Sequence, residues 1–119
     1  MKFLMTYASS AKAPSTPEHM MAIAKFSQEM TEAGILIMTG GLVRPSKGTQ
    51  IRLSNQKFSI TDGPFAETKE LIDGFALVEV KSKQHAIEVA ERFMRLAGDG
   101  EGEILQVFDP GGPPGPPPG

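Results

Sequence analysis

Hydrophobic residues recur along the chain with two clear periods. Residues 2–8 alternate in the manner that predicts a β-strand. Over residues 17–33 apolar side chains recur at helical spacing instead. A hydroxyl residue, Thr16, stands before Pro17, and Gly34 follows the last turn; these are typical start and stop signals of an α-helix. The chain is therefore expected to open with a strand and a long helix.

The same pattern returns after an inserted hairpin. The four consecutive apolar residues from Ile35 to Met38 predict a strand that is buried on both faces. A hairpin is predicted to turn at Asn55-Gln56. The predicted elements are strands 35–38, 50–54, 57–61 and 74–80, helix 82–97 and strand 103–108. Without the hairpin the order is βαββαβ, which predicts an α+β fold with a ferredoxin-like sheet.

One face of such a sheet has no helix left to cover it. Four strands span about 19 Å, and two helices of about 10 Å diameter cover one face completely. Apolar residues nevertheless point to both faces, with Leu77 on one and Ala76 and Val78 on the other. An uncovered apolar face marks a partner site, and two-fold pairing is the commonest oligomer. We expect a homodimer with Val78 in its interface, and a ligand or another protein as the alternative.

Composition narrows the class of protein further. The 119 residues amount to one domain, the formal charge is −2, and there is no cysteine. Without a basic face we expect no direct contact with nucleic acid, and disulfides and thiolate chemistry are excluded. No apolar stretch is long enough for a membrane span, so a cytoplasmic location is expected. Residues 110–119 contain only Pro and Gly and are expected to form an extended tail.

The most distinctive segment is residues 62–70, which read DGPFAETKE and are followed by Gly74-Phe75. This segment resembles the DGPF branch of the YCII-related family. The resemblance extends over residues 2–109 and includes the stretch from Gly41 to Pro45, so that a family domain is expected over 1–109. It implies a dimeric α+β barrel. Proteins of this branch are commonly encoded beside extracytoplasmic-function sigma factors, which implies a regulatory setting and an association with a sigma factor.

Some proteins of this family resemble small lyases or dehydrochlorinases that use a His–Asp pair, with the His on the first helix. The motif supplies Asp62 as a candidate base. His19 is the candidate partner, but it lies in the first turn of the predicted helix, and the family position falls nearer Ile23. Asp62 has a structural interpretation as well, since an Asp before Gly-Pro often accepts hydrogen bonds from turn amides.

Other residues are candidates for ligand binding. Tyr7 ends a strand, where its hydroxyl either enters a pocket or is the wet tip of a core residue. Arg44 follows a Gly-rich turn and is suited to an anionic ligand, although surface solvation explains it equally. The candidates within the motif are Phe65, Glu67, Thr68 and Lys69, with a core plug and a solvated turn as the alternative interpretations.

Three functions remain open from these residues, and one of them is a dimer with a purely structural role. The first is a binding or regulatory protein with a small-molecule pocket near Asp62. The alternative is a lyase or isomerase that uses Asp62 as base on a small organic acid or aromatic compound. We expect no cofactor in either case. No metal site is expected, because the two histidines lie on different helices without acids at ligand spacing.

Overall fold

The computed structural model describes residues 1–10, 16–42, 48–62 and 73–109. Within them the elements follow the predicted order, with one short strand, β6, that was not predicted. They are β1 (Lys2–Ser9), α1 (Pro17–Glu32), β2 (Leu36–Gly41), β3 (Thr49–Ser54), β4 (Lys57–Asp62), β5 (Gly74–Glu79), α2 (Lys83–Ala97), β6 (Gly100–Glu101) and β7 (Ile104–Val107). The Pro/Gly tail, residues 110–119, lies outside the described residues.

Both helices begin at the predicted hydroxyl residues. The backbone amide of His19 donates to Thr16 Oγ1, and the amide of His85 donates to Ser82 Oγ, each at 3.1 Å. Each side chain thus satisfies an amide that has no partner within its helix. Gly34, with φ of 77°, ends α1 in the left-handed conformation that glycine adopts without strain.

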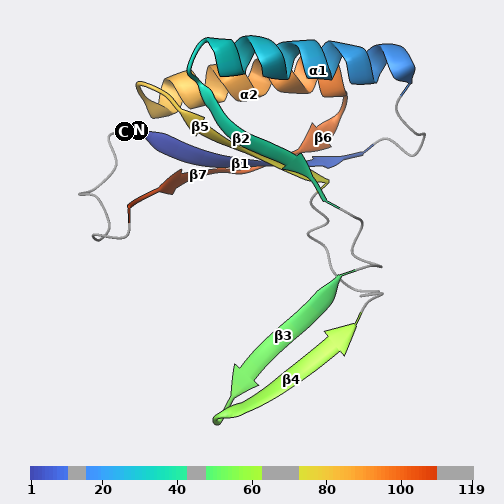
Figure 1. The fold of residues 1–119 in the computed structure, drawn as a ribbon, viewed down its shortest axis with the longest axis vertical. Coiled ribbons are helices and arrows are strands. Elements are labelled where there is room, and N and C mark those ends of the chain that lie inside the picture. Colours follow the sequence, from blue (N-terminus) through green and yellow to red (C-terminus); the bar gives the residue numbers. More distant parts are fainter. Residues whose placement is uncertain (11–15, 43–47, 63–72, 110–119) are drawn as a thin grey trace.

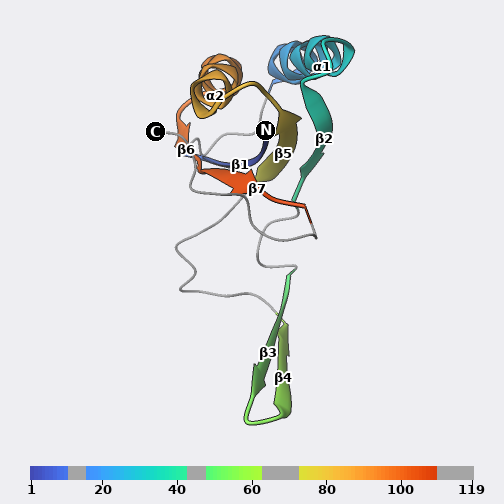
Figure 2. The ribbon, with the colours of Figure 1, turned by 90° about the vertical axis from the view of Figure 1, so that its left-hand side faces the viewer.

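The main sheet is antiparallel and has a ferredoxin-like strand order. β2 lies at one edge, followed by β5 and then β1, and both β6 and β7 pair with the far side of β1. α1 and α2 lie on the same face of this sheet (Figure 1 and Figure 2). The α+β prediction is therefore confirmed. In the part of the chain that the structure describes, the sheet is open and not closed into a barrel.

The register of the strands assigns each residue to one of the two faces. Phe3 pairs with Val78 and Leu4 with Leu77, so these two pairs point to opposite faces. Phe3 and Val78 are buried in the core beneath the helices, and Val78 is only 1% exposed. Leu77 therefore lies on the helix-free face. The expectation that Val78 belongs to a dimer interface is wrong, because the helices already cover that side chain.

The burial predicted for β2 is also wrong. It was expected to be buried on both faces, yet Ile37 is 50% and Met38 58% exposed. The cause is its place in the sheet. β2 is an edge strand, its pairing with β5 shifts register between Leu36 and Met38, and helices cover only one face.

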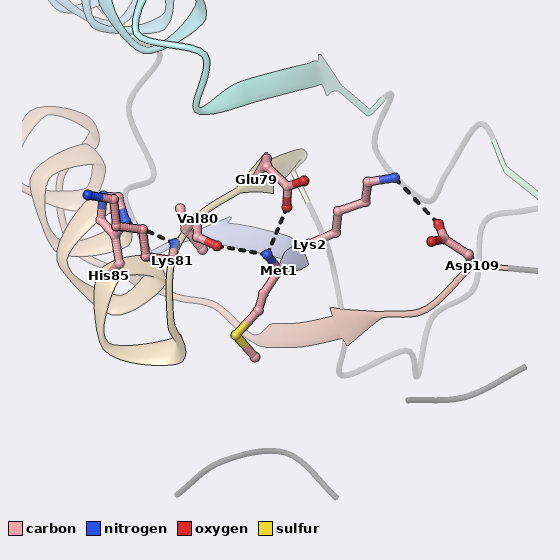
Figure 3. Close-up of polar contacts among 7 residues, drawn as sticks. All are labelled: Met1, Lys2, Glu79, Val80, Lys81, His85 and Asp109. Carbon is pink, nitrogen blue, oxygen red and sulfur yellow. Dashed lines mark hydrogen bonds and ion pairs between the residues drawn. The ribbon is translucent and has the colours of Figure 1, made fainter. Parts of the chain in front are cut away.

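The hydrophobic core lies between the main sheet and the helices, at the end where β1 begins and β5 ends. Phe3 and Val80 pack there against Ala86 of α2 and Met30 of α1. Polar contacts close the same end (Figure 3). The Met1 amino group lies 2.9 Å from the Glu79 carboxylate and donates to the Val80 carbonyl at 2.8 Å, and Lys2 Nζ lies 3.4 Å from Asp109 Oδ1. In the same region the Lys81 amide donates to His85 Nδ1 at 3.3 Å.

The predicted hairpin is confirmed. β3 and β4 pair from Thr49–Asp62 to Ser54–Lys57, and the turn residues Asn55 and Gln56 both have positive φ, 52° and 66°. Two central residues with positive φ are the signature of a type I′ turn, whose twist matches the flanking strands. The hairpin forms a separate two-stranded sheet that stands apart from the main one (Figure 1).

Candidate functional site

A cavity of about 630 Å³ lies between the main sheet and the two helices. Its walls are mainly apolar, and each helix contributes large side chains to it. They are Ile23, Phe26 and Met30 from α1, and Val89, Phe93 and Met94 from α2. The volume falls within the range of roughly 300–1,000 Å³ that is usual for small-molecule sites in proteins.

Small residues create this cavity. The sheet contributes Gly40, Gly41 and Gly74 to its lining, and α2 contributes Ala90 and Ala97. The side chains at Gly41, Ala90 and Ala97 are too small to fill the space between the sheet and the helices. At Gly40 the ring of Phe75 already lies 3.0 Å from the place of a Cβ. The cavity lies beneath the helices, so it does not contradict the expectation that they cover this face.

Tyr7 lies in the cavity wall, near the end of β1. Its hydroxyl donates to the Gly98 carbonyl at 2.8 Å and also lies 3.2 Å from the Asp99 carbonyl. Its ring meets the ring of Phe93 edge to face, with centroids 5.3 Å apart. Both contacts hold the side chain in one orientation between β1 and the end of α2. The structure thus brings the predicted residue Tyr7 to the cavity.

Asp73 also lines the cavity, directly before β5. Its carboxylate accepts a hydrogen bond from the Ser9 amide at 2.6 Å. Its own amide donates to the Tyr7 carbonyl, and its carbonyl accepts from the Leu42 amide, both at 2.8 Å. Asp73 therefore joins the ends of β1, β2 and β5, and these bonds fix a half-buried carboxylate at the wall.

The remaining polar groups of the wall are few. Thr39 on β2 donates its hydroxyl to the Phe75 carbonyl at 2.9 Å. Glu103 precedes β7, and its amide donates to Thr6 Oγ1 at 3.1 Å. Among the described residues that line the cavity, Asp73 and Glu103 are the charged ones. The described wall therefore combines an apolar interior with two carboxylate-bearing residues.

The two predicted catalytic candidates lie elsewhere. Asp62 is exposed at the end of β4, where its carboxylate accepts a hydrogen bond from the Thr49 hydroxyl at 2.8 Å. His19 is exposed in the first turn of α1. Neither is among the described residues that line the cavity, and the structure does not bring the two together there.

The other predicted ligand-binding residues fall outside the part of the chain that the structure describes. They are Arg44, Phe65, Glu67, Thr68 and Lys69. Within the described residues, no three His, Asp or Glu side chains lie close enough to hold a metal ion. No described helix has the length and apolar character needed to cross a membrane.

Reasoning from the sequence missed Asp73 and Thr39. A signal for Asp73 existed, because it stands directly before the strand that opens with Gly74-Phe75. Polar residues at strand ends often line binding sites, because binding and catalytic residues commonly lie on loops that a rigid scaffold holds in place. Thr39 carried no comparable signal, because it lies within an apolar and glycine-rich strand.

Comparison with known proteins agrees with this architecture. The family model described as the YCII-related domain matches residues 1–109. The chain is also 30% identical over 95 residues to an uncharacterised protein of Rhizobium meliloti (strain 1021), an overlap that covers 77% of each chain. The match spans the main sheet, both helices and the hairpin. The chain belongs to the YCII-related domain family.

Proposed function

We propose that this protein binds a small, largely apolar molecule in the cavity between its main sheet and its helices. The observation that carries the proposal is the cavity itself, about 630 Å³ in volume and lined mainly by aliphatic and aromatic residues. Burial of an apolar ligand there is worth roughly 25 cal/mol for each Å² removed from water. The few polar groups then set the orientation of the ligand.

The polar wall favours a ligand with a hydrogen-bond donor. The carboxylate of Asp73 is the charged acceptor in the wall whose position is fixed, by the Ser9 amide. An amino or hydroxyl group on the ligand would donate to it, while an aromatic or aliphatic body would pack between Phe93 and Phe26. A ligand carboxylate would carry the same charge as Asp73, so we expect amines and alcohols to bind in preference to carboxylic acids.

A binding or regulatory role agrees with placement in the DGPF branch, which rests on the motif at residues 62–70. In this proposal the bound molecule is a signal, and association with a sigma factor is the regulatory setting that the branch suggests. The pocket expected near Asp62 is reassigned to the cavity beside Asp73. The protein works as a two-fold homodimer in which a second copy covers the helix-free face.

Proton abstraction from the bound molecule is the second candidate function, because a carboxylate lines the cavity. A lyase or isomerase needs a base within hydrogen-bond reach of the proton that it removes. Asp73 and Glu103 are the described carboxylates of the cavity wall. Asp73, whose position the Ser9 amide fixes, replaces Asp62 as the first choice of base.

The intrinsic fluorescence of the protein tests the binding proposal directly. Tyr7 is the single tyrosine and there is no tryptophan, so tyrosine emission reports from the cavity wall. We expect titration with small aromatic and aliphatic amines to change this emission saturably, and the matching carboxylic acids to have a weaker effect.

A pair of variants makes the test specific for the cavity. Ala97→Leu adds a larger side chain to the cavity wall and should weaken binding about tenfold or more. Ala24→Leu adds the same atoms at an exposed position of α1 and should bind like the unmodified protein. Equal affinity of both variants, or an unchanged emission with every compound, would refute the proposal.

A further inference from the structure

Strand register divides the sheet side of the cavity into three rows. Alternate residues of a strand point to the same face, so the register that places Val78 beneath the helices places Ala76 and Gly74 there as well. The members of each row are paired across neighbouring strands, and all of them line the cavity. The inner row is Val78 and Leu36, the middle row is Ala76, Met5 and Thr39, and the outer row is Gly74, Tyr7 and Gly41. At two residues from row to row along a strand, the inner and outer rows lie about 14 Å apart.

Burial decreases from the inner row to the outer row. Val78 is 1% exposed and Met5 is 8% exposed, whereas Tyr7 is half-buried and Gly41 is exposed. The sheet side of the cavity is therefore deepest at the inner row and nearest to solvent at the outer row, in the part of the chain that the structure describes.

The two helices repeat this gradient on the other side of the cavity. Met30, near the end of α1, and Val89, in the first half of α2, are buried. Ile23, nearer the start of α1, and Ala97, the last residue of α2, are half-buried. Because Ala97 directly precedes the residue whose carbonyl accepts the Tyr7 hydrogen bond, the half-buried end of α2 lies beside the outer row.

The two ends of the cavity differ in chemistry. Phe3 and Val80, beside the inner row, belong to the hydrophobic core; each is 4% exposed, and neither lines the cavity. Asp73 directly precedes the outer row on β5. Glu103 accepts a hydrogen bond through its carbonyl from the amide of Thr6, the neighbour of the outer row on β1. Among the described residues, the cavity is thus closed by the apolar core at one end and carries its charged groups at the other.

We propose, on the basis of the binding function above, that the ligand is a linear amphiphile with a single polar head, bound with the head at Asp73 and the chain end at the inner row. The class of compound is a primary alkylamine or alkyl alcohol. The chain gains affinity because the inner end removes its apolar surface from water. A second polar group at the chain end would lose its hydration among Val78, Met30 and Val89, which is costly.

The distance between the rows sets the length of the chain. C–C bonds of about 1.5 Å that meet at tetrahedral angles advance an extended chain by about 1.25 Å for each carbon. Van der Waals contact with Val78 takes up about 4 Å of the roughly 14 Å. The remaining distance of about 10 Å is filled by an extended chain of about eight carbons. We therefore expect octylamine to fit the cavity best among unbranched amines.

A series of unbranched amines from butylamine to dodecylamine tests the orientation, with tyrosine emission as the readout. The affinity should rise roughly fourfold with each added methylene up to about octylamine, and should level off or fall for longer chains. Saturable binding whose affinity does not depend on chain length would leave the binding function standing but overturn the inserted chain. An emission that no compound changes would instead refute binding in the cavity itself.

The diamine of the same length as octylamine is the matched control for the single head. It carries a second amino group on the last carbon, so that one charge must enter the inner end whichever head binds Asp73. We expect it to bind at least tenfold more weakly than octylamine, because a buried charge without a partner is unfavourable. Equal affinities of the two compounds would overturn the proposal without touching the binding function.

Two variants of α2 locate the chain within the cavity. Ala90 and Ala97 both line it and lie seven residues apart, about 10 Å along the helix. Ala90→Leu, near the inner end, should weaken octylamine at least tenfold and change butylamine less than twofold, and the retained binding of butylamine shows that the variant is folded. Ala97→Leu, at the outer end, should weaken both amines by a similar factor. An equal loss of both amines in an Ala90→Leu protein with native circular dichroism would overturn the proposed orientation.

Discussion

The carboxylate of Asp73 accepts a hydrogen bond of 2.6 Å from the backbone amide of Ser9. The two residues are far apart in the sequence, and the bond joins the last residue of β1 to the start of β5. The same carboxylate lines the cavity. One side chain therefore has a structural role and the position of a ligand-binding group.

Substitution of Asp73 separates these two roles. Asp73→Ala leaves the Ser9 amide without its partner, which should cost about 1–3 kcal/mol and lower the melting temperature by at least about 4 °C. Asp73→Asn keeps an acceptor oxygen and should lose less than half of that. If Asp73 also binds ligand, Asp73→Asn weakens binding of amines while the fold survives. Calorimetry and tyrosine emission measure the two effects. Equal stability of both variants would contradict the structural role.

Asp62 should behave differently. It is exposed, and the acceptor that it offers to Thr49 is retained in Asp62→Asn. We expect Asp62→Asn to change the melting temperature by less than about 2 °C and to leave ligand binding in the cavity unchanged. If Asp62→Asn abolished an enzymatic activity without lowering stability, a lyase with Asp62 as base would become the favoured function.

Two charge substitutions distinguish the two faces of the sheet. Val78→Asp places an unpaired charge in the core and should prevent folding, since the side chain is 1% exposed. Met38→Asp changes a side chain that is 58% exposed on the helix-free face. It should leave the monomer folded but disrupt the dimer. Circular dichroism and sedimentation are the measurements, and a Met38→Asp protein that remains dimeric at micromolar concentration would exclude this face as the interface.

Gly102 should be intolerant of any side chain. A Cβ at this position would collide with the backbone carbonyl oxygen of Thr6, because the chain between β6 and β7 passes close to β1. Gly102→Ala should therefore destabilise the protein by about 1–3 kcal/mol, as overpacking does. At Gly41 the same methyl group meets nothing nearer than the Asp73 carbonyl oxygen at 3.8 Å, an ordinary contact. Gly41→Ala is the matched control, and thermal unfolding of both variants gives the comparison.

Local signals in the sequence were sufficient for the helices, the hairpin and the longer strands, but not for the short strand β6. Thr16 and Gly34 mark the two ends of α1, and Asn55-Gln56 marks the turn of the hairpin, because capping and turn formation depend on a few adjacent residues. The alternation along β1 and β5 predicted strands, and the order of elements predicted the ferredoxin-like sheet.

Position within the fold was harder to predict, because it depends on residues distant in the sequence. Val78 and Leu77 are both apolar, and only the register with Phe3 and Leu4 decides which of them faces the helices. The cavity escaped prediction for a similar reason. It arises from small residues on different elements, such as Gly41 and Ala97, that come together only in the folded chain.

The central place of β1 has a consequence for the order of folding during synthesis. β1 leaves the ribosome first, yet its two partners come much later, since Phe3 pairs with Val78 on one side and with Gln106 on the other. At about 5–20 residues per second the nascent strand waits several seconds for them. The hairpin and α1, whose contacts are local, are able to form within microseconds. β1 therefore stays without its partner strands until β5 and β7 have been synthesised, and the sheet is complete only when β7 pairs with β1.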